Sequence, residues 1–323
     1  MAGTEVAEGS SKMTKGLAVS TAVVAAGLML SPVLGAQTAA PKAAAQAQPE
    51  KWNSIPPLKA SDYAGKKPGP APRRDLSGIW DAPEFQGARQ VSGALEHPAL
   101  LPTKGGGSQG GQSDETGIAH PVPYTAAGLA ALKANHPSGP GVRQFPAALA
   151  NDPLDQCDPA GFPRMELYQF RTIELVQTGN QVIDLNEFYG GWRIIWTDGR
   201  ELPKDPDPRW NGYSVGKWAD DYTFVVETTG LNKRSWVDHA GRPHSDELRV
   251  EERFHRVDHD NMELTVIIND PKMYTEPWVA LNKFVLHLQP PDFDMAELLC
   301  SPIDMADYNK QIGDVVIEDS GKK

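Results

Sequence analysis

The chain has 323 residues and a formal net charge of −11, because 42 Asp and Glu outnumber 31 Lys and Arg. Proteins that bind a nucleic-acid backbone or an anionic membrane surface need positive potential, so this charge argues against both functions. Two cysteines are too few for a disulfide-dense scaffold or for a cysteine-rich zinc or iron–sulfur site.

Residues 1–36 have the pattern of a secretory signal peptide. Lys12 and Lys15 precede Gly16–Leu30, an uncharged stretch rich in Ala, Val and Leu, and a cleavage site of small residues follows it. The stretch is shorter than the roughly 20 residues that a transmembrane helix needs. We therefore predict an exported, periplasmic protein that has no membrane contact after signal removal. An uncleaved anchor is the alternative, and Met13 is a second candidate for the start.

The distribution of proline divides the chain. Eighteen of the 28 prolines lie in residues 41–165, and nine lie in residues 166–323. Because proline cannot donate to a strand ladder, the first region is expected to be irregular and the second to hold the sheet. We predict a signal peptide at 1–36, a Pro/Ala-rich linker at 37–74, a loop-rich segment with a first strand and a short helix at 75–165, a β-barrel core at 166–301 and a tail at 302–323.

Short segments with strand character recur along the chain and are separated by turn residues. Gly179-Asn180 and Asp198-Gly199 are typical hairpin and turn pairs. After Arg164 no helical segment is long enough to connect parallel strands, and closure of a meander removes exposed sheet edges. We therefore predict a mainly β fold, an antiparallel up-and-down β-barrel with a Pro/Gly-rich N-terminal extension. The nine predicted strands are Ile79–Ala82, Arg171–Thr178, Gln181–Phe188, Trp192–Thr197, Tyr213–Lys217, Tyr222–Thr228, Leu248–Val257, Met262–Ile268 and Ala280–Leu288, and one short helix is predicted at Pro123–Asn135.

The two cysteines are expected to form a disulfide. In an oxidising compartment an even count favours a bridge, here between Cys157 and Cys300, which would tie the end of the chain to its middle. Two free, buried thiols are the alternative. A catalytic role for Cys157 is disfavoured, because Asp155 and Asp158 would raise the pKa of its thiol.

The charged residues of the predicted strands allow two arrangements. In Leu248–Val257 one face is apolar apart from Glu252, whereas the other face carries charges. These charges either form a solvated outer face with cross-strand ion pairs or line a polar cavity. A barrel of about eight strands can hold one small ligand. The residues concerned are Glu187, Arg193, Glu227, Arg249, Glu251, Arg253 and His255.

The sequence contains no recognisable metal or cofactor motif. Its eight His residues form no HExxH pair, and His255 and His259, the only two spaced four apart, flank a charged turn. Gly105–Gly111 lacks the Lys-Ser/Thr of a phosphate-binding loop, and no Gly-x-Ser-x-Gly elbow is present. We therefore predict no metal and no cofactor.

The segment Asp198–Arg249 holds the densest group of aromatic and polar side chains. Six of the eight Trp residues lie between positions 192 and 278. An aromatic-lined concavity with a few polar groups is what a small-molecule site requires, although aromatic residues are also common in barrel cores. The predicted substrate-binding residues are Trp210, Trp218, Trp236, Asn232, Glu187 and Arg193.

His244 is the leading candidate for acid–base chemistry. It lies in a loop directly before a predicted strand, where Pro243 restricts the backbone. Its ordinary pKa near neutrality suits proton transfer. Asp238 is predicted to orient the imidazole, and Tyr213 to act as the partner acid or as an oxyanion donor. A structural histidine that caps its loop is the alternative.

Four motifs together resemble a family of exported bacterial proteins. They are NDPLDQCDPAGFPR, DGRELPKDPDPRWNGYSVGKW, GRPHSDELRVEERF and NDPKMYTEPW, and the resemblance covers about residues 75–301. It implies an exported protein with a lipocalin-like β-barrel and assigns no catalytic residues. The sequence departs from the family pattern at Asp294–Pro302, where DMAELLCSP replaces a more acidic and aromatic tail.

These observations favour a periplasmic, cofactor-independent acid–base enzyme that acts on a hydrophobic small molecule in a barrel cavity. Because elimination needs only an acid and a base, a lyase is the leading prediction, ahead of a hydrolase or an isomerase. Side-chain cleavage of a lignin-derived aromatic dimer is one concrete version. A non-catalytic periplasmic carrier that uses the same pocket is the alternative, and a structural surface protein is the third hypothesis. A small molecule is the expected partner, and homo-oligomer formation is left open.

Overall fold

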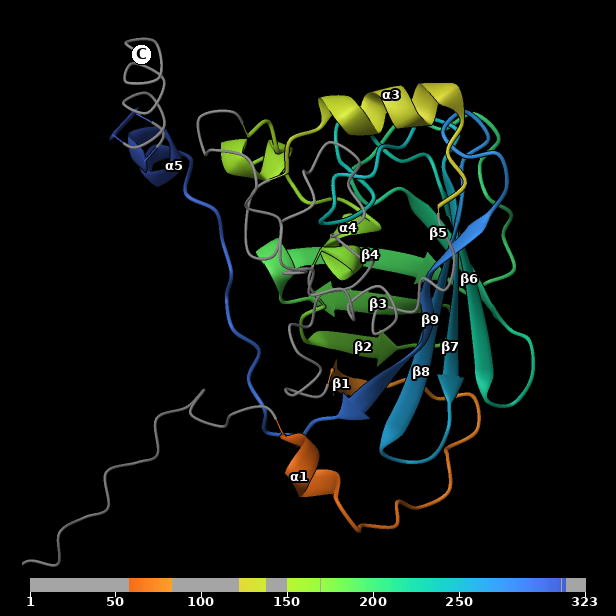
Figure 1. Ribbon diagram of the computed structural model, residues 1–323. Helices are drawn as coiled ribbons and strands as arrows, with labels where there is room; N and C mark the ends of the chain where they lie inside the picture. Colours follow the sequence, from red (N-terminus) through yellow and green to blue (C-terminus); the bar gives the residue numbers. More distant parts are fainter. Residues whose placement is uncertain (1–57, 83–121, 138–149, 169, 309, 312–323) are drawn as a thin grey trace, which may run out of the picture. The chain divides into compact units, whose positions relative to one another are not determined.

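Nine strands close into one β-barrel, in which each strand pairs with its neighbours in chain order (Figure 1). The computed structural model describes residues 58–82, 122–137, 150–168, 170–308 and 310–311. The predicted signal peptide and Gly105–Gly111 lie outside the described residues. The strands are β1 Gly78–Asp81, β2 Ile173–Gln177, β3 Gln181–Asn186, β4 Gly191–Trp196, β5 Tyr213–Trp218, β6 Thr223–Thr229, β7 Arg249–Arg256, β8 Asn261–Asn269 and β9 Trp278–Leu288. The helical segments are α1 Ala60–Tyr63, α3 Ala126–Ala134, η3 Pro153–Gln156, α4 Arg164–Leu167, η4 Phe188–Gly190 and α5 Pro302–Tyr308.

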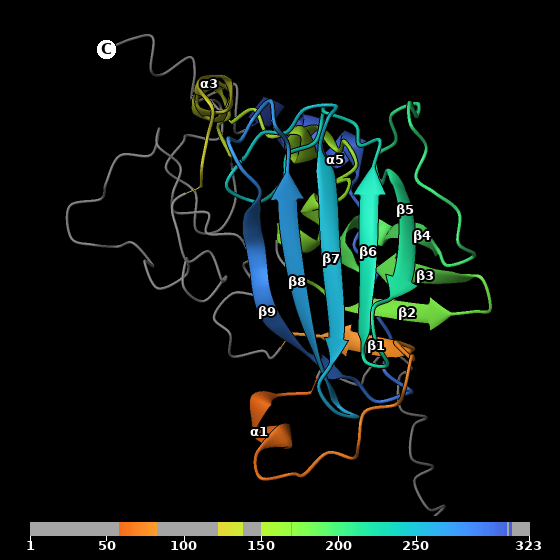
Figure 2. The same cartoon turned by 90° about the vertical axis from the view of Figure 1, so that its right-hand side faces the viewer.

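The mainly β fold, the barrel and each of the nine predicted strands are confirmed, and strand limits agree within two residues. One junction differs from the antiparallel prediction, because β4 and β5 pair in parallel through Ile195↔Ser214 and Trp196↔Val215. A two-residue turn forces antiparallel pairing, whereas the long connection 197–212 lets β5 start beside the end of β4. The other strand pairs are antiparallel, and Figure 2 shows β6 to β9 side by side.

The strands separate an apolar interior from a charged outer face. In β7 the side chains of Val250 and Phe254 point into the core, while Arg253 on the alternate face is exposed. Glu227 on β6 is also exposed, but Arg193 on β4 is only 3% exposed. Of the strand charges considered, Glu227 and Arg253 therefore lie on the exposed face, whereas Arg193 is buried inside the barrel.

One end of the barrel is filled by the segment that precedes β2. Phe162, Met165, Leu167 and Phe170 from this segment all belong to the hydrophobic core. A side chain at Gly191, the first residue of β4, would lie 3.1 Å from the Met165 sulfur. The short helix α4 therefore packs closely against the start of β4, and it carries both apolar and charged side chains into the barrel.

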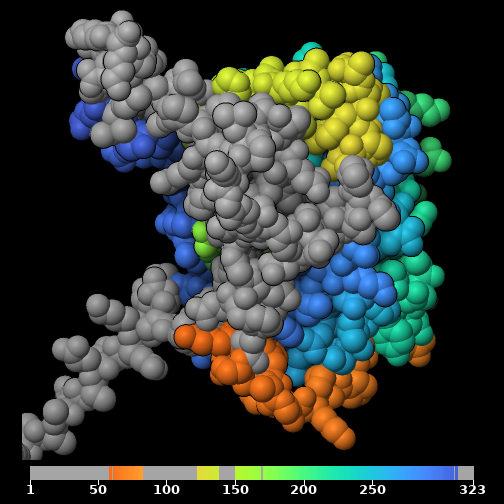
Figure 3. Space-filling view, viewed as in Figure 1, coloured from red at the N-terminus to blue at the C-terminus, as the bar shows by residue number. Residues whose placement is uncertain are grey.

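Two helical segments pack at opposite ends of the barrel (Figures 1 and 3). At one end, α3 approaches the β8–β9 loop so closely that any side chain at Gly128 would collide with the Met273 backbone. At the other end, α1 packs through Tyr63, whose ring stacks on His287 with centroids 4.0 Å apart. The predicted linker therefore contains an ordered element that contacts β9. Among the described residues, no helix combines the length and apolarity needed to cross a membrane.

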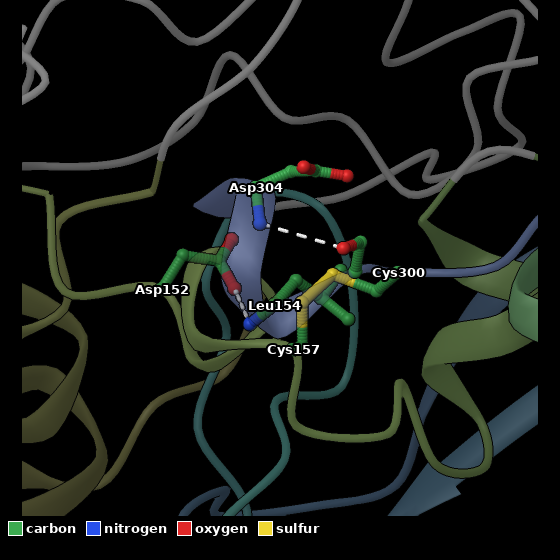
Figure 4. Close-up of a disulfide and its surroundings, with 6 residues drawn as sticks. Asp152, Leu154, Cys157, Cys300 and Asp304 are labelled. Atoms are coloured by element: carbon green, nitrogen blue, oxygen red, sulfur yellow. Dashed lines mark hydrogen bonds between the residues drawn. A yellow bond between two sulfur atoms is a disulfide. The ribbon is translucent and has the colours of Figure 1, made fainter. Parts of the chain in front are cut away.

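The predicted disulfide between Cys157 and Cys300 is present, with the two Cα atoms 5.5 Å apart (Figure 4). Cys157 directly follows η3, whose start is capped by Asp152 through a 2.9 Å bond from the Leu154 amide. The bridge joins η3 to the segment that leads into α5. Because α5 itself has no buried residue, the disulfide is the covalent link that holds this segment to η3.

Candidate functional site

The barrel interior contains one arginine surrounded by three carboxyl groups. Arg193 on β4 donates through Nη1 and Nη2 to the two oxygens of Glu252 on β7, at 2.7 and 2.5 Å. Its Nε donates to Asp184 on β3 at 2.8 Å, and Nη2 also lies 3.2 Å from Glu166 on α4. The carboxyl groups are fully buried, and the Phe162 ring covers the guanidinium at 3.9 Å. We call these four ionisable residues the Arg193 cluster.

The charge balance of the Arg193 cluster requires a proton. Three ionised carboxylates around one guanidinium would leave two uncompensated negative charges in the core, which is strongly unfavourable. Burial and the neighbouring charge of Glu252 raise the pKa of Glu166 well above its usual range, despite the opposing effect of Arg193. Burial also raises the pKa of Glu252, against the lowering effect of Arg193. Of these two groups, Glu166 therefore has the stronger tendency to keep a proton.

Two carboxyl oxygens of the cluster have no hydrogen-bond partner among the described residues. They are Oε2 of Glu166 and Oδ1 of Asp184. Both oxygens of Glu252 are bound to Arg193, so Glu252 mainly compensates the charge of the guanidinium. The cluster thus contains Glu166, whose pKa is raised, and Asp184, which accepts from Arg193, and each has an oxygen without a described partner.

His244 is buried in the β6–β7 loop and forms a pair with Ser235. Its Nδ1 lies 3.0 Å from the backbone oxygen of Ser245, and its Nε2 lies 3.1 Å from Oγ of Ser235. Because a carbonyl oxygen only accepts, Nδ1 carries the hydrogen and Nε2 accepts from Ser235. Burial lowers the pKa of His244, although the bond to Ser245 and the charge of Asp270 oppose this. The imidazole is therefore neutral at pH 7.

Asp238 is bound to a different partner from the predicted one. Its Oδ2 accepts from Nη1 of Arg242 at 2.5 Å, and its Oδ1 accepts from the backbone amide of Ala240 at 2.9 Å. The Nδ1 position of His244, which Asp238 was expected to occupy, is taken by the Ser245 carbonyl. Asp238 therefore fixes the turn 238–242 through Arg242.

The other predicted site residues fall into separate groups. Asn232 lies beside Ser235, and its backbone oxygen, 3.2 Å from Oγ of Ser235, competes with Nε2 of His244 for the single hydroxyl hydrogen. Trp236 and Trp210 pack under the guanidinium groups of Arg164 and Arg234, respectively. Tyr213 and Trp218 occupy the two ends of β5, where they contact Arg209 and Phe224. Glu187 follows β3 and is 8% exposed. His244 and Asn232 therefore meet at Ser235, and Arg193 belongs to the interior cluster.

Sequence inspection missed three members of the Arg193 cluster. Glu252 was visible as the interruption of an apolar strand face. Asp184 and Val182 both lie on the buried face of β3, although the opposite face carries the more apolar Ile183 and Leu185. Glu166 lies in a four-residue helix, which is too short to produce a periodic pattern.

Three open depressions on the outer face of the barrel are each bordered by Arg249. Their volumes are about 360, 880 and 400 Å³. Leu202 and Glu227 border the first and the third, which lie on the two sides of the 199–202 segment. No member of the Arg193 cluster lines any of the three, so they are separate from the interior site.

The described residues contain no group of three or more His, Cys, Asp or Glu residues arranged to hold a metal ion. No family model matches the chain, and no curated protein or solved structure matches it.

Proposed function

We propose that the protein is a cofactor-independent acid–base enzyme, a lyase, and that the Arg193 cluster is its proton-transfer centre. The substrate is a hydrophobic, aromatic small molecule, and the reaction takes place in the periplasm. The observation that carries the proposal is the presence of three fully buried carboxyl groups around one guanidinium. Carboxyl groups with strongly raised pKa values in an apolar setting are typical of catalytic acids.

The arrangement supplies both groups that an elimination needs. Asp184 accepts from Nε of Arg193 through Oδ2 and has no described partner at Oδ1, so we assign it the removal of a proton from carbon. The electron pair of that C–H bond forms the new double bond as the carbon–oxygen bond breaks. Glu166 then delivers its proton from Oε2 to the leaving oxygen. Transfer of the abstracted proton from Asp184 to Glu166 restores the starting state.

His244 is the competing candidate for the catalytic base. Its imidazole is neutral and held in place, but Nε2 already accepts from Ser235 within the buried part of the β6–β7 loop. Its predicted role remains a prediction that His244→Ala tests in the same kinetic experiment, and the roles of Asp238 and Tyr213 also remain predictions.

The test uses the full chain and a lignin-type aromatic dimer, guaiacylglycerol-β-guaiacyl ether, offered as the alcohol and as its ketone without added cofactor. Liquid chromatography follows substrate loss and product formation. We expect Glu166→Gln and Asp184→Asn to lower turnover by about 100-fold or more. Glu251→Gln, which removes an exposed carboxylate paired with Arg253 at 2.6 Å, is the matched control and should stay within twofold.

The outcomes separate the hypotheses. Unchanged turnover in Glu166→Gln would show that the Arg193 cluster is structural. A large loss confined to His244→Ala would instead assign the catalytic role to His244 in the β6–β7 loop. Binding of the dimer without any product, measured by calorimetry, would favour the periplasmic carrier instead. Circular dichroism of each variant shows whether the barrel is intact.

A further inference from the structure

Asn186 is a buried amide beside the Arg193 cluster with an unused donor. It is 3% exposed, and its Oδ1 accepts from the Phe188 amide at 2.8 Å. Its Nδ2 has no hydrogen-bond partner among the described residues. The bond to Phe188 fixes the orientation of the amide plane, so the two N–H groups are held in place. Buried donors without a partner are rare in native proteins, and each calls for an explanation.

The register places Asn186 two positions after Asp184 on the same face of β3. The buried face of β3 is formed by every second residue, namely Val182, Asp184 and Asn186. Asp184 and Asn186 therefore point to the same side, about 7 Å apart along the strand. Across the ladder, Asp184 pairs with Arg193, and Asn186 pairs with Gly191, which has no side chain. Asn186 therefore lies on the same inner wall as the proposed base.

A donor next to a base is the arrangement that activates a carbon acid. Removal of a proton from a carbon beside a carbonyl group moves negative charge onto the carbonyl oxygen. A fixed amide N–H directed at that oxygen stabilises the charge as it develops. The alcohol form of the same substrate has no oxygen that can accept this charge, so Asn186 would give it no comparable assistance.

We propose that Asn186 is an oxyanion-stabilising residue and that the substrate class is a ketone with an oxygen leaving group β to the carbonyl. This inference rests on the proposed function, because it uses Asp184 as the base and Glu166 as the acid. Asp184 takes the α-proton, and the electron pair forms an enolate whose oxygen accepts from Nδ2 of Asn186. The enolate then re-forms the C=O bond, a Cα=Cβ bond forms, the Cβ–O bond breaks and the leaving oxygen takes the proton of Glu166. The products are an α,β-unsaturated ketone and an alcohol or water.

Two probes separate the steps. Propiophenone has an α-proton but no leaving group, so its hydrogen–deuterium exchange in D₂O, followed by proton NMR, reports on Asp184 and Asn186 alone. The elimination of water from 3-hydroxy-1-phenylpropan-1-one, followed by absorbance, requires Glu166 as well. Wild-type protein should accelerate both, and 1-phenylpropane-1,3-diol, which lacks the carbonyl, should not react.

Asn186→Asp keeps an acceptor for the Phe188 amide and replaces the Nδ2 donor with a carboxyl oxygen, whereas Asn186→Ala removes the donor without adding an ionisable group. Both variants should lower both rates by about 100- to 1,000-fold, as loss of one oxyanion donor does. Asn211→Ala removes an amide whose Nδ2 bonds the Trp192 carbonyl outside the cluster and should leave both rates within twofold. Glu166→Gln should abolish elimination and leave propiophenone exchange intact, which distinguishes failure of this inference from failure of the proposed acid.

A second measurement does not depend on turnover. The infrared carbonyl band of propiophenone bound to wild-type protein should shift to lower frequency, and the shift should be absent in Asn186→Ala. An unshifted band in wild-type protein, or wild-type exchange rates in Asn186→Asp, would overturn the inference and leave the amide as a site for buried water. Exchange at the buffer rate in wild-type protein would also overturn it, while the lignin dimer assay judges the proposed function separately.

Discussion

Replacement of Glu166 by glutamine should change how the stability of the protein depends on pH. Burial and the charge of Glu252 raise the pKa of Glu166, so the folded state keeps a proton that the unfolded chain releases above about pH 4.3. The stabilising contribution of this carboxyl group is complete below that pH and is lost as the pH rises toward the folded-state pKa. Wild-type protein should therefore lose stability relative to Glu166→Gln as the pH rises from about 4.3 toward the folded-state pKa, by at most about 1.4 kcal/mol per pH unit.

Urea unfolding at a series of pH values measures this difference, with the free energy of unfolding obtained by linear extrapolation. Glutamine keeps the shape of the side chain and replaces the carboxyl proton with an amide donor, so the comparison isolates one titration. Glu251→Gln, on the opposite face of β7 and partly exposed, should change stability by less than about 1 kcal/mol and leave the pH profile parallel to that of wild type. Parallel profiles for wild type and Glu166→Gln would refute a proton on Glu166.

Three further predictions concern other parts of the molecule. Reduction of the disulfide, which spans 143 residues, should lower the free energy of unfolding by up to roughly 4–5 kcal/mol in urea titrations, and equal midpoints with and without reductant would contradict this. Gly216→Ala should destabilise by about 1–3 kcal/mol, because the new Cβ would lie 2.8 Å from a ring carbon of Phe224, whereas Gly179→Ala, with nothing within 4 Å, should be nearly neutral in thermal unfolding. Because burial lowers the pKa of His244, its contribution is present above about pH 6.5 and is lost as the pH falls. His244→Asn should therefore remove the contribution to stability that rises with pH up to about 6.5, and an unchanged slope would argue against a neutral imidazole in the fold.

The strands were predictable because their signals are local. Period-2 alternation and turn residues such as Gly179-Asn180 act within a few positions, and they fix the β2–β3 pairing that the structure shows. The parallel β4–β5 pair was not predictable from such signals, because it depends on the path of the connection 197–212. The disulfide followed from the cysteine count and needed no geometry.

The candidate site was only partly predictable, since its members are chosen by burial rather than by residue type. Arg193 and Glu227 looked equivalent in the sequence, yet one is buried and the other is exposed. In β3 the residue types suggest the wrong buried face, because the polar residues Asp184 and Asn186 lie on the inner face. His244 was identified, but its partner was expected to be Asp238, and the nearby Arg242 binds that carboxylate instead.

The Arg193 cluster is difficult to explain by stability alone. Replacement of a buried ion pair or triad by apolar side chains of similar volume is often neutral or stabilising, so packing would be served equally well without these charges. Its members come from β3, β4, β7 and α4, so the excess of carboxyl groups over guanidinium groups exists only in the folded barrel. A fold that retains three carboxyl groups for one arginine maintains a proton inside an apolar core. The same inner wall places the free oxygen of Asp184 near the unused amide of Asn186. The proposed acid on α4, with the proposed base and oxyanion donor on β3, would account for the retained charge more directly than a structural role does.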